Sequence, residues 1–154
     1  MEGALIDNLV LLFTVVYYAF LMAVYIIRAH GRSELELMLA PVFSVQLVPF
    51  GVLWALTILR GESGRIISLM PIIAFLVYDL WYRLITRRKP QHHPDRWPWE
   101  LRVYLLLLMA GSIGLNWYGY IVSEFYGRIL VACFFIMMGS FGYYQYRYRK
   151  SRAQ

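Results

Sequence analysis

The sequence predicts an all-α membrane protein, a polytopic bundle of five transmembrane helices. Three observations support this prediction. Of the 154 residues, 60% are hydrophobic and only 16% are charged, whereas soluble domains are about half apolar and about a quarter charged. The charged residues are concentrated in short breaks between five long apolar stretches. The basic residues fall mainly in every second break, as in a chain that crosses a membrane repeatedly.

The first three apolar stretches are residues 9–27, 35–59 and 66–85. A hydrocarbon core about 30 Å thick requires about 20 helical residues, which each stretch supplies approximately. The first stretch follows an acidic N-terminus, whereas a cleaved signal peptide begins with positive charge. We therefore expect it to remain as a membrane helix. Ser33 and Glu36 have the spacing of a capping box, which predicts a helix start at the second stretch.

The longest polar segment, residues 86–102, is predicted to be a cytoplasmic loop. Its three prolines disfavour a continuous helix. The apolar sequence that follows is too long for one crossing, and the polar Ser123–Arg128 segment divides it into spans 103–122 and 129–146. Residues 147–154 form a basic tail on the cytoplasmic side. The five spans together make one transmembrane domain.

The distribution of basic residues favours five spans over four. With five spans, twelve of the fifteen Lys and Arg residues fall on one side, and only Arg60, Arg65 and Arg128 fall on the other. Because Lys and Arg are enriched in cytoplasmic loops, the basic side is predicted to be cytoplasmic. The N-terminus is then outside the cell membrane and the C-terminus inside. A four-span alternative, in which the last two spans are fused, would place the basic tail outside.

This topology explains the net charge of +6 without a nucleic-acid partner. The first interpretation of the basic clusters beside the spans is that they fix the topology and anchor the protein to anionic lipid. The more specific hypothesis is that they bind anionic headgroups, a phosphorylated substrate or an acidic partner. The residues concerned are Arg87, Arg88, Lys89, Arg147, Arg149 and Lys150.

Asp79 is the acidic residue that lies farthest inside a predicted span. A carboxylate at this depth is costly unless it is paired, protonated or hydrated. Arg83 follows four residues later on the same helix face, so the first interpretation is an ion pair near the cytoplasmic interface. The alternative is a proton or ion site, with Gln46 and Asn116 lining the same pathway. Amides within membrane helices more commonly form hydrogen bonds between helices.

Two groups of small residues predict close helix packing, within the chain or with a second chain. They are Ala110, Gly111, Ser112 and Gly114 in the fourth span, and Gly139, Ser140 and Gly142 in the fifth. Prolines are also present within spans: Pro41 and Pro49 in the second and Pro71 in the third. They are interpreted as ordinary kinks, because neighbouring helices can satisfy the backbone groups that a proline frees. The alternative is a broken helix that forms a binding site.

The sequence predicts no metal, no cofactor and no catalytic centre. His92, His93 and Asp95 are close in the loop, but adjacent histidines rarely point at one ion and no second cluster completes the shell. The single cysteine, Cys133, is predicted to act as a small core hydrophobe.

These observations favour a non-catalytic subunit or interaction protein of a membrane complex. Its expected partners are membrane lipids and other membrane subunits or further copies of the chain. The first alternative is a small transporter or ion channel with a pathway near Asp79, Gln46 and Asn116. The second is a lipid-modifying enzyme at the cytoplasmic face, which lacks a recognisable nucleophile or metal set.

Overall fold

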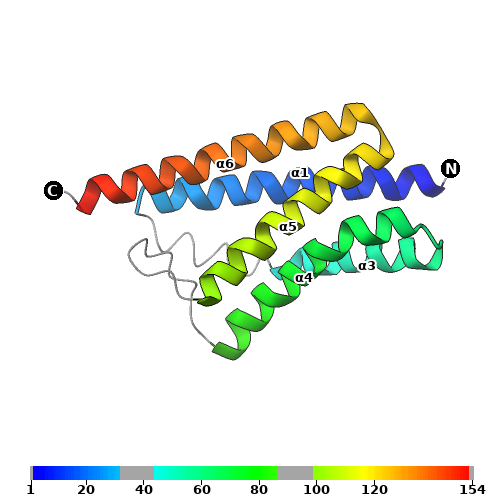
Figure 1. Ribbon diagram of the computed structural model, residues 1–154, viewed down its shortest axis with the longest axis horizontal. Coiled ribbons are helices and arrows are strands. Elements are labelled where there is room, and N and C mark those ends of the chain that lie inside the picture. Colours follow the sequence, from blue (N-terminus) through cyan, green and yellow to red (C-terminus); the bar gives the residue numbers. More distant parts are fainter. Residues whose placement is uncertain (1, 32–43, 87–98, 153–154) are drawn as a thin grey trace.

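The computed structural model describes residues 2–31, 44–86 and 99–152, and these residues form a bundle of α-helices (Figure 1). All the regular secondary structure in the described part of the chain is helical, which confirms the predicted fold class. The helices are α1 (Glu2–Ala29), α3 (Leu47–Leu59), α4 (Ser63–Thr86), α5 (Trp99–Val122) and α6 (Glu124–Arg152).

Four of the described helices, α1, α4, α5 and α6, are long and apolar enough to cross a membrane. They correspond to the first, third, fourth and fifth predicted spans, and each extends beyond the predicted bounds. Helix α3 has 13 residues and covers the second half of the second predicted span. The first half of that span, with Pro41 and the Ser33–Glu36 capping box, lies outside the described residues. A fifth complete crossing therefore stays a prediction.

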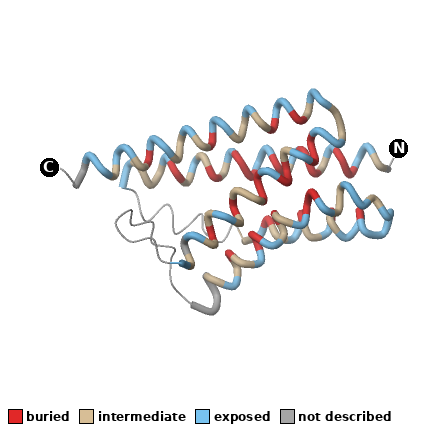
Figure 2. Tube along the Cα trace, viewed as in Figure 1, coloured by how far each residue is buried: buried red, intermediate tan, exposed pale blue. Residues whose placement is uncertain are grey.

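The helices form two pairs, α1 with α6 and α4 with α5; α5 also packs against α6, and α3 lies against α4. The two pairs lie close together at the end of the molecule that holds the N-terminus, and they diverge toward the opposite end (Figure 1). Buried residues gather where the pairs converge (Figure 2). Cys133 is partly buried and packs against this core, as expected of a small hydrophobe.

The polar breaks that alternate along the sequence lie at opposite ends of the bundle. The N-terminus, the α3–α4 turn and the α5–α6 turn lie at one end of the bundle, which we call the N-terminal end (Figure 1). The last turns of α1, α4 and α6 and the first turn of α5 lie toward the other end, which we call the basic end (Figure 1). The described basic residues that the sequence grouped together on one side are therefore found at the same end.

Glycines in the left-handed region end two of the helices. Gly61, with φ of 68°, follows α3, and its N–H donates to the Ile58 carbonyl at 2.9 Å. The next N–H, from Glu62, donates to the Thr57 carbonyl at 3.2 Å, which completes a Schellman motif. Gly31, with φ of 69°, ends α1 in a similar way. A residue with a Cβ is strained at such a φ, so glycine permits these abrupt ends.

The prolines are accommodated within helices. Pro71 lies inside α4, which continues without interruption on both sides of it. Pro49 is the third residue of α3, in the first turn, where its missing N–H removes no intrahelical bond. A turn at Gln46 precedes α3 and separates it from the short helical stretch at Ser44 and Val45. The helix of the second predicted span is therefore interrupted just before α3.

Among the described residues, only one of the two small-residue groups contacts another helix of the chain. At Gly114, a Cβ would overlap the carbonyl oxygen of Ser68. At Gly111, a Cβ would lie 3.2 Å from the Cα of Ile72, so both glycines allow α5 to approach the backbone of α4. A Cβ at Gly139 or Gly142 on α6 would meet no atom within 4 Å among the described residues.

This difference predicts opposite effects of the same substitution at two glycines. Gly114→Ala should lower the free energy of unfolding by about 1–3 kcal/mol, because α4 and α5 must separate to admit the methyl group. Gly139→Ala, the matched control, should leave stability unchanged or raise it slightly, since alanine has the higher helix propensity. Equilibrium unfolding in detergent micelles measures both. Equal destabilisation by the two variants would contradict the packing described for α5.

Candidate functional site

A cleft with a volume of about 560 Å³ opens between the last turn of α1 and the last turns of α6. Small-molecule sites commonly have volumes of about 300–1,000 Å³. We call this site the basic cleft, because three of its lining side chains carry a formal positive charge. Its lining residues are Arg28, Ala29, His30, Gly31, Tyr144, Arg147, Tyr148 and Lys150.

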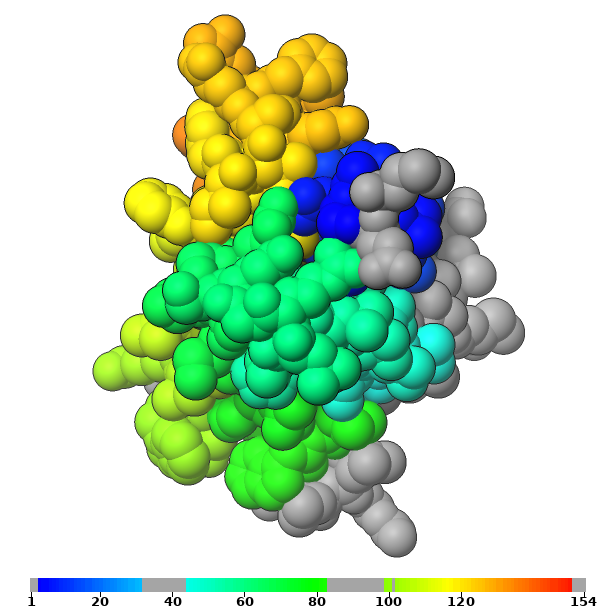
Figure 3. Space-filling view, turned by 90° about the vertical axis from the view of Figure 1, so that its right-hand side faces the viewer, coloured from blue at the N-terminus to red at the C-terminus, as the bar shows by residue number. Residues whose placement is uncertain are grey.

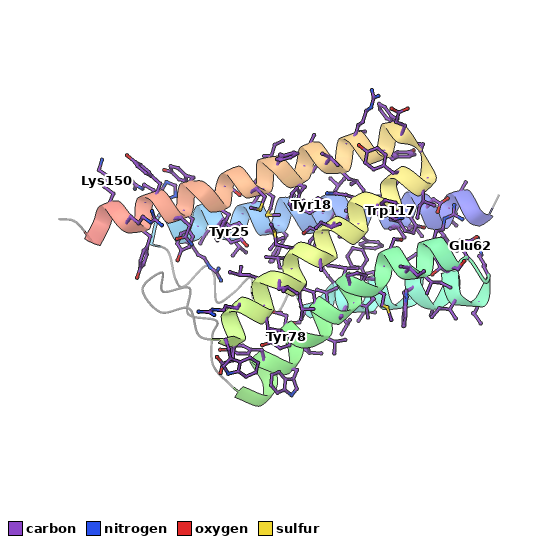
Figure 4. All side chains as sticks on the ribbon, viewed as in Figure 1. Tyr18, Tyr25, Glu62, Tyr78, Trp117 and Lys150 are labelled. Carbon is purple, nitrogen blue, oxygen red and sulfur yellow. The ribbon has the colours of Figure 1, made fainter. Side chains whose placement is uncertain are left out.

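The basic cleft forms because α1 and α6 run side by side in the same direction (Figure 1). The Tyr18 ring lies 6.3 Å from the Phe134 ring, and the Tyr25 ring lies 5.1 Å from the Phe141 ring. The two residues of each ring pair are the same number of positions apart in the sequence. The two helices therefore stay in register, and the last turn of α1 lies beside Tyr144. Figure 4 shows Lys150 near the C-terminal end of the molecule and Tyr25 between it and Tyr18.

His30 is fixed at the rim of the cleft by a local contact. Its Nδ1 atom lies 2.8 Å from the carbonyl oxygen of Ile26, a distance at which the ring donates a hydrogen bond to the end of α1. The ring centroid also lies 6.3 Å from that of Tyr143 on α6. The Ile26 carbonyl also accepts the backbone N–H of His30 at 3.2 Å, so the ring adds a second contact to it while touching the neighbouring helix.

The charged side chains among the described lining residues of the basic cleft are all positive. No acidic side chain is among its described lining residues, whereas Arg28, Arg147 and Lys150 each contribute a positive charge. The ends of α1 and α6 oppose this field, because each helix C-terminus carries about half a negative charge. The basic side chains therefore gather where two helix C-termini end together, a position at which cations are favourable.

The predicted anion-binding residues divide into three groups. Arg147 and Lys150 line the basic cleft. Arg149 is exposed on α6 and does not line it. Arg87, Arg88 and Lys89 lie outside the described residues. Sequence reasoning missed the contribution of Arg28 and His30, although both follow a span on the same predicted side as the C-terminal basic residues.

Asp79 lies in the interior of the bundle, with none of its surface exposed. Its carboxyl group is close enough to Tyr17 on α1 to interact with it electrostatically. Tyr104 on α5, whose ring lies 5.1 Å from that of Phe75, interacts with Tyr17 in the same way. The side chain of Arg83 lies outside the described part of the structure, so the Asp79–Arg83 ion pair stays a prediction.

Of the two amides predicted to share a pathway with Asp79, Asn116 can be placed relative to it along the bundle. Asn116 lies two residues beyond Gly114, which faces Ser68. Asp79 is eleven residues farther along α4 than Ser68, which is about three helical turns. Gln46 is buried at the start of α3, one turn before Phe50. Asn116 and Asp79 are therefore at different levels of the bundle.

The prediction of a hydrogen bond between helices is confirmed for Asn116. The Tyr18 hydroxyl on α1 lies 3.0 Å from the Asn116 Oδ1 atom and 3.0 Å from the Ser112 carbonyl oxygen, both on α5. A hydroxyl has one proton, so it donates to one of these oxygens at a time. The contact links α1 to α5 in the middle of the bundle.

A polar cluster at the N-terminal end was not anticipated from the sequence. Asp7 on α1 is 2.7 Å from the Arg65 guanidinium on α4, and it accepts a hydrogen bond of 2.8 Å from the Tyr118 hydroxyl on α5. Arg65 also pairs with Glu62 at 2.8 Å. Figure 3 looks onto this end, where α1 and the two interhelical turns meet, and Figure 4 labels Glu62 there.

The Asp7–Arg65 pair was missed because both residues lie just outside the predicted spans. Asp7 lies two residues before the first predicted span, and Arg65 lies directly before the third. The five-span topology puts both residues on the same side of the membrane. Opposite charges at span ends on one side are a signal for such a pair. The sequence alone does not show that the first and third spans are close enough to form it.

Within the described residues, no group of three His, Cys, Asp or Glu side chains is placed to hold a metal ion. His92, His93 and Asp95 lie outside these residues. Comparison with known proteins finds no matching family, no matching curated protein and no matching solved structure.

The polar cluster predicts a large stability effect from a change that preserves shape. Asp7→Asn should lower the free energy of unfolding by about 1–3 kcal/mol, because it removes one of the two carboxylates that pair with the partly buried Arg65 and leaves only Glu62. The exposed Glu124–Arg128 pair, with 72% of each side chain accessible, supplies the control. Glu124→Gln should have little effect. Chemical unfolding of both variants in micelles tests this, and equal losses would count against a structural role for Asp7.

Proposed function

We propose that the chain is a multi-pass membrane protein that acts through association, as a non-catalytic subunit of a homo-oligomer or of a larger membrane complex. The observation that supports this proposal best is the exposed face of α6. It carries two glycines among large apolar and aromatic side chains. We call it the outward face, and its residues are Phe135, Ile136, Gly139, Gly142, Tyr143 and Tyr146.

Helix α6 is the least buried of the four candidate spans. Only 17% of its most apolar window is buried, against 33–39% in α1, α4 and α5. Apolar side chains exposed on a membrane helix can simply face lipid, so exposure alone does not indicate a partner. The glycines on the outward face provide the stronger argument.

In this chain, buried glycines occur where helices approach each other closely. Gly111 and Gly114 face the backbone of α4, and a Cβ at Gly119 would lie 3.1 Å from the Cα of Gly127. Gly139 and Gly142 have the same spacing as Gly111 and Gly114 but no such neighbour among the described residues. Because glycine within a helix costs about 1 kcal/mol relative to alanine, a second helix that uses this open surface would account for the pair.

The membrane orientation forms part of the proposal. The basic end would face the cytoplasm and contact anionic headgroups of the cell membrane, with the N-terminus outside. Arg28, Arg147 and Lys150 at this end support that orientation. The opposite end carries acidic as well as basic side chains, among them Asp7 and Glu62. This mixed charge does not favour a cytoplasmic position for the N-terminal end.

Association through the outward face predicts that bulky substitutions at its glycines weaken the oligomer. Gly139→Leu and Gly142→Leu should each weaken association at least tenfold, about 1.4 kcal/mol, because the added side chain holds the partner helix away. Stability of the single chain should not change. Energy transfer between labelled chains in liposomes, measured over a range of protein-to-lipid ratios, gives the affinity.

Gly51→Leu is the matched control for this experiment. Gly51 is also in a helix, and a Cβ there likewise meets no atom within 4 Å. It lies on α3, away from the outward face, so the variant should associate like the unmodified protein. A strictly monomeric unmodified protein that co-purifies with no other subunit, or equal loss with Gly51→Leu, would overturn the proposal.

The second candidate function is transport of a proton or cation, supported by the complete burial of Asp79 in a candidate span. If Asp79 carries the ion, Asp79→Asn should abolish flux in liposomes while the protein remains folded. Glu124→Gln, which alters an exposed carboxylate, should leave the flux unchanged. An unmodified protein with no ion-gradient-driven flux, or loss of folding alone in Asp79→Asn, would reject transport and leave Asp79 with a structural role.

A further inference from the structure

We propose that the ion carried through the bundle is a proton, and that Tyr17 and Gln46 line its path to Asp79. The inference rests on the second candidate function, transport, and extends it by naming the ion and two residues of the path. It depends on three observations. The three side chains are buried, they come from different segments that meet in one part of the bundle, and their polar groups suit proton transfer.

The packing of α3 against α4 places Gln46 near the level of Asp79. The two helices lie side by side in opposite directions (Figure 1), and the Trp54 Nε1–H donates to the Ile66 carbonyl at 3.3 Å. Gln46 is eight residues before Trp54, so the opposite position on α4 is eight residues after Ile66, near residue 74. Asp79 is five residues farther, which is about 8 Å along a helix.

Tyr17 on α1 connects these two positions. Its ring centroid lies 6.3 Å from that of Phe50, which follows Gln46 by about one helical turn. The Tyr17 side chain also interacts electrostatically with Asp79 on α4 and with Tyr104 on α5. Tyr17 therefore lies in a part of the interior to which α1, α3, α4 and α5 all contribute side chains.

The interior around these residues contains a polar atom that water can reach by hydrogen bonding. Tyr17 and Asp79 have 0% of their surface exposed, and Gln46 has 8%. The Gln46 Oε1 atom has no hydrogen-bond partner among the described residues. Buried polar atoms that lack a protein partner commonly bind ordered water. A water molecule at Gln46 would extend the path from Tyr17 to the start of α3.

The chemistry of these groups fits a proton better than a metal cation. A tyrosine hydroxyl both donates and accepts hydrogen bonds, so it can pass a proton to a carboxylate. Carboxylates within membrane helices commonly serve as proton relays. Hard divalent cations take about six to eight oxygen ligands. Within the described residues, no group of three His, Cys, Asp or Glu side chains is placed to supply them.

The start of α3 provides a further argument against a cation held at Gln46. This residue is the N-cap of α3, and a helix N-terminus carries about half a positive charge. A metal cation bound there would be repelled by that charge. A proton does not have to reside at Gln46, because the Asp79 carboxylate takes it up from one side and releases it to the other.

The two adjacent tyrosines of α1 have separate roles under this proposal. The Tyr18 hydroxyl lies 3.0 Å from both Asn116 Oδ1 and the Ser112 carbonyl oxygen, so it links α1 to α5. The Tyr17 ring contacts the rings of Tyr18 and Phe50 at 5.6 Å and 6.3 Å. A phenylalanine at position 17 can make the same ring contacts, but it cannot pass a proton.

The ion is identified by flux into liposomes that hold the full chain and an internal pH-sensitive dye. The medium contains potassium and N-methylglucamine but no sodium, and valinomycin sets an inside-negative potential that drives protons inward. We expect the interior to acidify at least tenfold faster than in protein-free liposomes. Addition of sodium to both sides should leave this rate unchanged.

The adjacent tyrosines also provide the matched variants. Tyr17→Phe should slow proton entry at least tenfold, because it removes the hydroxyl that interacts with Asp79. Tyr18→Phe removes a contact between helices, so it should lower stability but change proton entry less than twofold. Gln46→Leu, a second variant of the path, should also slow entry at least tenfold. Thermal unfolding of each variant in detergent shows whether the rates simply follow stability.

Two kinds of failure can be distinguished. Flux that requires sodium, or equal proton entry in Tyr17→Phe and the unmodified protein, would overturn the inference and leave transport in place. Equal losses in Tyr17→Phe and Tyr18→Phe would also overturn it, because they would reflect a disturbed fold. Absence of both proton and sodium flux would reject transport itself and the inference with it. None of these results bears on association through the outward face of α6, which is measured separately.

Discussion

The ion pair between Asp7 and Arg65 is the constraint on which the arrangement of the bundle most depends. It joins α1 to α4, two helices that share no close backbone packing in the described part of the chain. The Tyr118 hydroxyl extends the connection to α5, and the Tyr18 hydroxyl adds a second link between α1 and α5. In lipid there is no hydrophobic force that drives helices together, so polar links and close packing must hold the α1–α6 pair against the α4–α5 pair.

The links are unevenly placed, and the shape of the molecule follows from that. Asp7 and Arg65 draw the helix pairs together at the N-terminal end, while the pairs diverge toward the basic end (Figure 1). The basic cleft lies at that diverging end, between the termini of α1 and α6. Helix α6 packs against α1 and α5, has an outward face with two open glycines, and forms part of the cleft at its end. Association through the outward face would use a different part of α6 from the part that packs inside the chain.

The helix boundaries show where reasoning from hydropathy is incomplete. Charged residues were taken to end the spans, but Asp7 lies inside α1 and Arg65 inside α4. Each charge is tolerated there because it is paired with the other, and the pairing depends on a neighbour 58 positions away in the sequence. At the other end, α6 continues through Arg147 to Arg152, which the sequence assigned to a tail beyond the span. Arginine and lysine have good helix propensity, so a basic composition marks the end of an apolar stretch without ending the helix.

The sequence by itself determined the helical class, the four described candidate spans and the alternation of charge between the two ends of the bundle. Hydropathy and charge are local properties, and a span of about 20 apolar residues can be recognised without knowing its neighbours. Tertiary structure decided which helices pair and which face each helix turns inward. Gly111 and Gly114 have the same spacing as Gly139 and Gly142, yet only the first pair contacts another backbone within the described structure. Likewise, Arg28 and Arg147 form one cleft only because α1 and α6 lie in parallel with their ends aligned. Such contacts depend on the relative rotation and offset of distant helices, which no local pattern of residues specifies.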